Sequence, residues 1–465
     1  MRSKLLYWRD VLRTSYWFIP LVMTAGSIAL AFASVELDRT IGGQEQMLSW
    51  SYTGGPDGAR SMLAVAASSM ITVAGVVFSI TIVSLSLASS QFGPRLLRNF
   101  IRDRGNQAVL GTFIATFVYC LLVQRTVRGD GFGSFVPGVS MVVAVLLVLA
   151  NMMVLIYFIH HVATTIQANE VVGAVAAELQ QTIERLFPER LDEHRDEMPR
   201  YDVSVPDAAP ASVAAKGSGY VVTLDEDQIV RIAEREDLCV RMACSPGHFV
   251  VAGDRIAEVW PAESLDEETH AKIADALELD LDRSALQDVG FGIDQLVEVA
   301  VRALSPGVND PFTAMTCIDR LSQALCLLAE RKIPSPQRFD DSQRLRVILT
   351  PLSFPGMLDE AYDQIREYGS SSTAVSRRLL QALERIARRV RRPEDLEAIE
   401  RQGKLVMRGA KAIAEEEDGR DVKRRMNVLE KVVSERRAQL ASDSRNGDAV
   451  ADDQAKTVRS LPKDR

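Results

Sequence analysis

The sequence predicts an α-helical membrane domain of four transmembrane helices, followed by a cytoplasmic α+β domain that combines a small β-module with helices. Two observations predict this. Hydrophobic residues make up 47% of the 465-residue chain and are concentrated in its first third, whereas the remaining ~300 residues are rich in charge and long enough to fold around cores of their own. Residues 61–90 contain no charged side chain, and an uncharged run of that length is typical of a membrane span.

Three further apolar segments accompany residues 61–90, namely Ser15 to Val35, Ala108 to Val123, and Val136 to Val162. A span needs roughly 20 mostly apolar residues, so the first and last of the three are long enough. The middle one is short, and local thinning of the bilayer or a snorkelling Arg125 could accommodate it. The N-terminal segment is longer than the apolar part of a signal peptide, so we expect an anchor. We therefore expect a transmembrane domain over residues 1–162.

Basic side chains near the spans gather in the N-terminal arm and in the loop after the second span: Arg2, Lys4, Arg9, Arg13, Arg95, Arg98, Arg102 and Arg104. The other two loops carry fewer, and in the first of them acidic residues offset the arginines. Cytoplasmic loops carry the excess of lysine and arginine in membrane proteins. The sequence therefore predicts that both termini are cytoplasmic.

Hydroxyl-bearing and small residues fall on one narrow face of the second span. At about 100° per residue, this face consists of Ser68, Thr72, Gly75, Ser79, Val83, Ser86 and Ser90. Two interpretations remain open. The hydroxyls could line a conduit without placing a fixed charge in the membrane. Alternatively, small residues allow another helix to approach closely while each hydroxyl bonds to a carbonyl one turn earlier.

The two interpretations predict different functions. The first predicts a homo-oligomeric channel or transport-like protein whose second span lines the conduit, and the second predicts a non-conducting membrane scaffold or sensor. The basic stretch RLLRNFIRDR, residues 95–104, favours the channel because it could collect anions at a cytoplasmic mouth. The same stretch is equally typical of an amphipathic helix that lies in the membrane interface.

A helical extension and linker is expected over residues 163–199, and a small β-module over residues 200–265. The second half of this module, Pro246 to Val259, resembles half of the small barrel of biotinyl and lipoyl carrier domains. Those carriers place a modified lysine at a hairpin tip, but no lysine occurs between Gly217 and Pro261. We therefore expect a structural or docking module rather than a carrier.

A mainly helical domain is expected over residues 266–440, followed by a disordered tail over residues 441–465. In the segment SPGVND, Asp310 is predicted to cap a helix that has Pro311 at its first position. The N–H groups of this helix start and the nearby polar side chains form a candidate anion-binding or structural loop: Arg302, Ser305, Asn309, Asp310 and Thr313. We favour the structural interpretation, in which the cap itself occupies those donors.

The sequence predicts no catalytic residue, cofactor or metal. It contains no Walker loop, dinucleotide fingerprint, GxSxG elbow or HExxH motif. The five cysteines are scattered and none belongs to a CxxC pair. His160 and His161 are adjacent at the end of the fourth span, but no carboxylate or third ligand stands at helical spacing from them, which favours an interfacial polar pair over a metal or proton site.

A run of arginines marks the C-terminal helical region: Arg377, Arg378, Arg385, Arg388, Arg389, Arg391 and Arg392. The net charge of the chain is −8, and no nucleic-acid motif accompanies the run. A solvated helix face or contact with anionic lipid therefore explains it better than binding of nucleic acid.

Two blocks of the sequence together resemble a known family. They are FSITIVSLSLASSQFGPRLLRNFIRDRGNQ and QDVGFGIDQLVEVAVRALSPGVNDPFTA. The family is that of bacterial predicted multi-pass membrane proteins catalogued as domain of unknown function 2254, and the resemblance covers Trp8 to about Ala438. It implies a multi-pass protein of the bacterial plasma (inner) membrane. It implies no established activity, so no functional residues are transferred.

Overall fold

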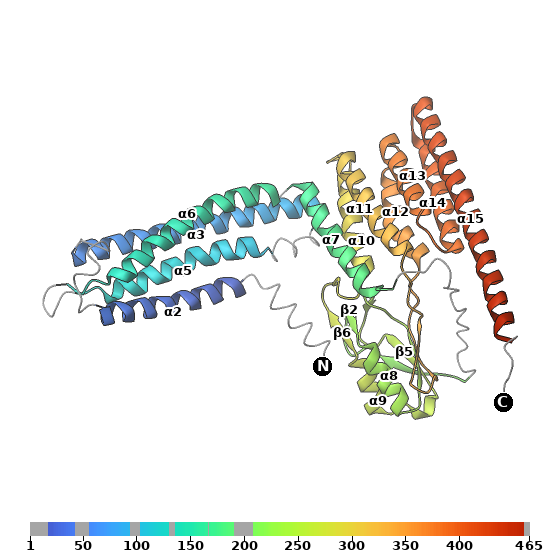
Figure 1. The fold of residues 1–465 in the computed structure, drawn as a ribbon, viewed down its shortest axis with the longest axis horizontal. Coiled ribbons are helices and arrows are strands. Elements are labelled where there is room, and N and C mark those ends of the chain that lie inside the picture. The colour runs from blue at the N-terminus through green and yellow to red at the C-terminus, as the bar shows by residue number, and fades with distance from the viewer. Residues whose placement is uncertain are drawn as a thin grey trace. The chain divides into compact units, whose positions relative to one another are not determined.

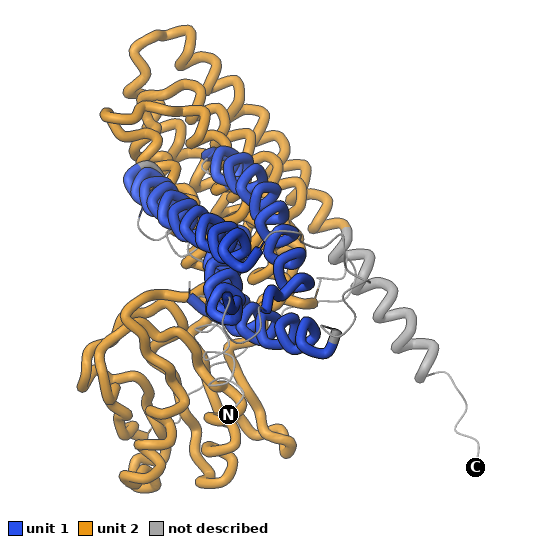
Figure 2. The backbone as a smooth tube through the Cα atoms, turned by 90° about the vertical axis from the view of Figure 1, so that its left-hand side faces the viewer, with its two compact units in different colours: residues 1–170 blue, residues 171–465 orange. Residues whose placement is uncertain are grey.

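The computed structural model describes residues 17–41, 55–93, 103–129, 135–165, 167–189 and 208–459. The chain divides into two compact units, residues 1–170 and residues 171–465 (Figure 2), and each is described by itself. The basic N-terminal arm, most of the basic loop after the second span, and residues 190–207, which are the end of the predicted linker and the start of the expected β-module, lie outside the described residues.

The first unit contains four long helices: α2 (Phe18–Ile41), α3 (Pro56–Phe92), α5 (Arg104–Thr126) and α6 (Gly138–Thr165) (Figure 1). Each is long and apolar enough to cross a membrane, which confirms the four helices expected from the sequence. At 1.5 Å per residue α3 is about 55 Å long, well beyond the ~30 Å thickness of the hydrocarbon core. The apolar segment Ala108 to Val123, which is short for a span, lies within α5, and polar residues at both of its ends extend this helix to Arg104–Thr126.

Helix α5 forms the centre of the first unit and packs against α2, α3 and α6. Its buried side chains include Phe113, Tyr119 and Val123. Half of the apolar window of α5 is buried inside the unit, against 17% for α3 and for α6. The core of this unit is therefore built around the least apolar of the four helices.

A buried polar cluster joins α2, α5 and α6. The Asp38 carboxylate accepts hydrogen bonds from the backbone N–H groups of Val139 and Ser140, at 2.7 and 2.9 Å, and from the Ser140 hydroxyl at 2.6 Å. Ser34 and Tyr119 complete the cluster, with their hydroxyl oxygens 2.9 Å apart. Asp38 thus supplies both hydrogen-bond acceptors and a negative charge to the start of α6.

The second unit begins with α7 (Ala168–Leu186), which crosses the boundary between the units, and continues with two sheets. The sheets are formed by β1 (Ala211–Ala214), β2 (Gly219–Leu224), β3 (Cys239–Met242), β4 (Phe249–Val250), β5 (Arg255–Trp260), β6 (Leu277–Asp280), β7 (Gln337–Phe339) and β8 (Leu345–Ile348). One has the order β1-β5-β3-β8-β7 and the other β4-β2-β6. Three short helices accompany them: α8 (Glu226–Arg235), η2 (Ala262–Ser264) and α9 (Glu267–Ala274).

The β-module draws strands from beyond the expected boundary at residue 265. Strand β6 pairs with β2, and β8 pairs in parallel with β3 through Val240 and Val347. Both of these valines are fully buried in the core of the module. Without β8, the edge of β3 that faces away from β5 would expose its backbone groups, so a strand distant in sequence completes the sheet.

Six further helices of the second unit form three hairpins: α10 (Val289–Ala303) with α11 (Pro311–Ala329), α12 (Phe354–Tyr368) with α13 (Thr373–Ala387), and α14 (Pro393–Gly409) with α15 (Glu416–Arg459). The short helix η3 (Ala410–Ala412) lies between α14 and α15. Each helix also contacts its counterpart in the next hairpin, so the hairpins are stacked (Figure 1). Apolar side chains such as Leu325, Leu358 and Leu383 fill the space between them.

Helix α15 extends into the segment for which a disordered tail is expected, from Ala441. The backbone of α15 remains helical to Arg459, and only residues 460–465 of the predicted tail lie outside the described residues. Extending an existing helix fixes one residue for each new hydrogen bond, which costs far less than starting a helix. The composition of the tail therefore did not exclude continuation of the preceding helix.

A partly buried ionic cluster lies where the β-module meets the helical hairpins. Arg283 binds Asp288 at 2.8 Å and Asp294 at 2.5 Å, and the Asp288 carboxylate also caps α10 by accepting from the Phe291 N–H. The turn before β4 lies against this cap, because a Cβ placed on Gly247 would stand 2.3 Å from an Asp288 carboxylate oxygen. Glycine at position 247 therefore permits the close approach of turn and helix.

Glu360 of α12 faces this cluster and gives the second unit a predicted pH dependence. Burial raises the pKa of Glu360 from 4.5 to about 7, and repulsion from Asp294 acts in the same direction. Between pH 4.5 and about pH 7, Glu360 is protonated in the folded chain and ionised in the unfolded chain. The free energy of unfolding therefore falls as the pH rises through this range.

We expect Glu360→Gln, which stays neutral, to be more stable than the parent protein at pH 8 and to lose this advantage near pH 5. Chemical unfolding of the full chain in detergent at both pH values measures the difference. Glu367→Gln is the matched control, because Glu367 lies exposed on the same helix. An equal effect of Glu360→Gln at both pH values would contradict the prediction.

Candidate functional site

The hydroxyl-bearing face of the second span lies exposed along α3. It consists of Ser68, Thr72, Gly75, Ser79, Ser86 and Ser90, and every one of these residues is exposed in the single chain. We call this set the hydroxyl stripe. No heavy atom lies within 4 Å of a Cβ built on Gly75, so the stripe is not covered at its middle by another part of the described chain.

The face that α3 uses for packing within its unit is a different one. It is formed by Leu63, Ala67, Met70, Ala74 and Val77, all of which are buried. At about 100° per residue, the centre of this packing face lies about 160° from the centre of the hydroxyl stripe. The stripe therefore points away from the neighbouring helices of the same chain.

Hydroxyl groups of the stripe donate to their own helix. Ser68 donates to the Val65 carbonyl at 3.1 Å, Thr72 to the Ser68 carbonyl at 2.7 Å, and Ser90 to the Leu87 carbonyl at 2.8 Å. A hydroxyl that donates inward keeps its oxygen lone pairs as acceptors on the outer side. The stripe can thus stay in an apolar environment at little cost, or offer acceptors to a polar solute or another helix.

The SPGVND loop is a closed, capped turn. The Asp310 carboxylate accepts from the N–H groups of Phe312 and Thr313, at 3.0 and 3.1 Å, and from the Thr313 hydroxyl at 2.5 Å. These bonds, that from Thr313 first, lower the pKa of Asp310. Asn309 has a φ of +49°, and Ser305 donates its hydroxyl to the Arg302 carbonyl at 2.6 Å. The first donors of α11 are thus occupied by a negatively charged cap, which fits the structural interpretation better than an anion site.

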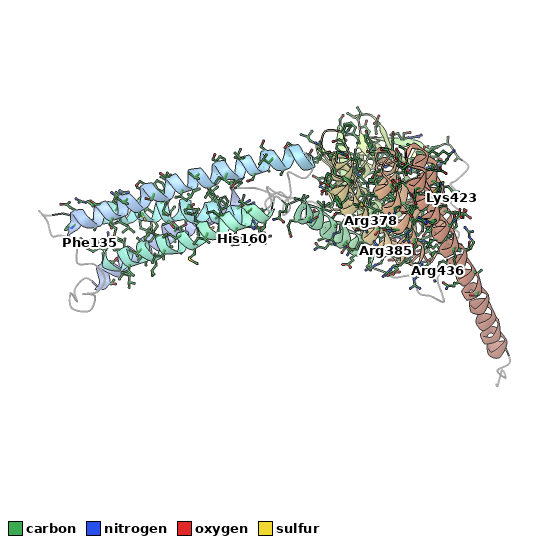
Figure 3. All side chains as sticks on the ribbon, turned by 90° about the horizontal axis from the view of Figure 1, so that it is seen from above. Phe135, His160, Arg378, Arg385, Lys423 and Arg436 are labelled. Atoms are coloured by element: carbon green, nitrogen blue, oxygen red, sulfur yellow. The ribbon has the colours of Figure 1, made fainter. Side chains whose placement is uncertain are left out.

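A carboxylate stands beside His160 and His161, and it belongs to Asp103, the residue that caps the start of α5. Asp103 caps α5 by accepting from the Gly105 N–H at 2.8 Å, and its second oxygen lies 2.6 Å from His161 Nε2. Tyr157 stacks on the His161 ring with 5.3 Å between the ring centres. His160 (Figure 3) is exposed. Sequence spacing missed this contact because Asp103 lies 58 residues before His161.

The described residues show no group of three or more histidine, cysteine, aspartate or glutamate side chains that could hold a metal ion. Four of the five cysteines are buried, and burial raises the pKa of the Cys326 thiol to about 11. Cys326 lines an open pocket of about 690 Å³ between α7, α11 and α13. Because a thiolate rather than a thiol is the nucleophile, Cys326 is poorly suited to react there.

Carboxylates of other helices neutralise much of the arginine run. Arg378 and Arg385 (Figure 3) lie 3.4 and 3.6 Å from the carboxylate of Asp319, on α11. Arg377 pairs with Asp421 at 3.0 Å, and Arg389 pairs with Glu330 at 2.8 Å. Surface pairs of this kind add little stability each, but they reduce the net positive charge that would attract anionic lipid. The run is therefore mainly a set of contacts between helices.

Comparison with known proteins places the chain in a family. The family model described as predicted membrane protein (DUF2254) matches residues 13–385. The chain belongs to this family. An uncharacterized protein of Mycobacterium tuberculosis is 33% identical over 424 residues, which are 89% of this chain and 80% of that relative. An uncharacterized protein of Mycobacterium bovis is similar to the same extent. No solved structure matches the chain.

The family match covers all four apolar helices, the hydroxyl stripe and the SPGVND loop. Its description confirms the resemblance noted in the sequence and supports a membrane protein, without an activity. The two mycobacterial relatives are likewise described only as uncharacterized. Within this family, the geometry of the chain itself is therefore the basis for a functional hypothesis.

Proposed function

We propose that this chain is a multi-pass protein of the bacterial plasma membrane, with both termini in the cytoplasm, that assembles with copies of itself so that α3 helices line a conduit. The observation that carries the proposal is the direction of the hydroxyl stripe. It lies on α3 about opposite the face that packs against α5, so copies can meet through the stripe without disturbing the core of the first unit.

The chemistry of the stripe fits a conduit for small polar solutes. Serine and threonine oxygens can replace part of a hydration shell while leaving no fixed charge in the membrane. Exposed apolar residues flank the stripe, among them Val65, Val76 and Leu87, and these suit contact with lipid or with the flanks of neighbouring α3 helices. A ring of α3 helices would thus have a polar interior and an apolar exterior.

We expect the purified protein to conduct in planar lipid bilayers, and Ser79→Leu to reduce the conductance to the background of protein-free membranes. The leucine would place an apolar, bulky side chain at the middle of the conduit. Ser69→Leu is the matched control, because Ser69 is also exposed on α3 but lies about 90° from the centre of the stripe. We expect Ser69→Leu to conduct like the parent protein.

The alternative function is a non-conducting scaffold or sensor in which the stripes form a seam between two copies. The self-bonded hydroxyls of Ser68, Thr72 and Ser90 favour it, because such a stripe needs no water. Light scattering of the protein in detergent separates the two. A strict monomer contradicts both functions, whereas a dimer without conductance at any applied voltage contradicts the conduit and supports the scaffold.

A further inference from the structure

An apolar tip protrudes from the second unit at the turn between α10 and α11. Its two large side chains, Val308 and Phe312, are 59% and 76% exposed. The turn that displays them is braced, because the Asp310 N–H donates to the Ala303 carbonyl at 2.7 Å while its carboxylate caps α11. Two apolar side chains are therefore held outward by a rigid support and cannot fold back into the core.

The tip lies at the same end of the second unit as the start of α7. Near the other end of α7, Arg185 donates to the Leu286 carbonyl at 2.8 Å, just before α10 begins. Glu184 lies 3.8 Å from Arg331, just after α11 ends. Helix α7 therefore runs antiparallel to α10 and parallel to α11, so the turn between those two helices is level with the first part of α7.

The start of α7 is tied closely to the last apolar helix. Helix α6 ends at Thr165 and α7 begins at Ala168, so three residue steps of at most ~3.6 Å each separate them. Helix α6 is long and apolar enough to cross a membrane. The first residue of α7 thus lies within about 11 Å of the last residue of α6.

We propose that Val308 and Phe312 insert into the headgroup region of the lipid bilayer and anchor the second unit to the membrane surface. Aromatic and aliphatic side chains on a braced turn suit this interface, because removing their apolar surface from water is favourable. The anchor rests on α6 spanning the bilayer, and it is independent of whether α3 lines a conduit.

The test places an environment-sensitive fluorophore on Phe312→Cys in the full chain, reconstituted into liposomes that contain lipids with a nitroxide in the headgroup region. Labelling is directed to the new site because four of the native cysteines are buried and the fifth is partly so. We expect the nitroxide lipids to quench most of the emission. We also expect a blue shift relative to the same protein in denaturant.

Leu281→Cys is the matched control. Leu281 is 85% exposed and precedes Arg283, which binds the cap at the start of α10, so it lies a helix length from the tip. Its label should keep its emission in the nitroxide lipids. Equal quenching at both sites, or a blue shift at position 312 without quenching by the lipids, overturns the proposal, and the latter result would indicate protein rather than lipid at the tip. Neither the quenching nor the blue shift depends on whether the protein conducts.

Discussion

Gly247→Ala is expected to destabilise the β-module of the second unit by about 4 kcal/mol. Two costs combine at this position. Gly247 has a φ of +93°, which side chains other than that of glycine rarely adopt, and its Cβ would stand 2.3 Å from the Asp288 carboxylate. That carboxylate is bound to Arg283 and caps α10, so it cannot move aside without breaking the ionic cluster.

Gly253→Ala separates the two costs. Gly253 has nearly the same φ, +92°, but no heavy atom lies within 4 Å of its Cβ position. We expect it to cost only about 1–2 kcal/mol, which is the backbone strain alone. Hydrogen exchange of the full chain, followed by mass spectrometry on peptides from residues 239–260, measures both variants. Equal protection in the two variants would show that the contact with Asp288 is unimportant.

Asp38→Ala is expected to destabilise the first unit by about 3 kcal/mol. The substitution leaves the N–H groups of Val139 and Ser140 without the acceptor that they have in the structure, and it removes the negative charge at the start of α6. Because Asp38 is only 7% exposed, water does not readily replace the carboxylate. The loss should therefore exceed that of an ordinary exposed helix cap.

Unfolding by sodium dodecyl sulfate in mixed micelles measures the effect of Asp38→Ala. Glu36→Ala is its control, because Glu36 lies on the same helix and its ion pair among the described residues, with Arg39, is exposed. Such pairs contribute between nothing and about 1 kcal/mol. If both alanine variants unfold at the same detergent fraction, the buried cluster does not stabilise the unit.

Local sequence patterns predicted those parts of the protein in which the residues of a segment indicate its own environment. The four apolar helices followed from composition, since a membrane requires a long apolar run wherever a helix crosses it. The cap at Asp310 followed from a residue type beside a proline. The hydroxyl stripe was visible from its spacing, but its direction was not, because only the packing of α3 on α5 shows which face remains open.

Contacts between distant segments could not be predicted in this way. The parallel pairing of β8 with β3 depends on a strand about 100 residues farther along the chain. Asp103 and His161 meet because two helix ends come together, and the arginine run is neutralised by acids of α11 and α15. Each of these contacts joins groups that look solvated or unpaired when only their own helix is considered.

The central position of α5 has a consequence for what holds this helix in a membrane. Its mean hydropathy is 1.7, the lowest of the four apolar helices, against 2.8 for α6. Its buried Asn106, Gln107 and Thr116 are shielded by neighbouring helices rather than by lipid. Such polar side chains are costly in lipid unless other helices cover them. We therefore expect α5 to be held in the membrane more by its contacts with α2, α3 and α6 than by contact with lipid.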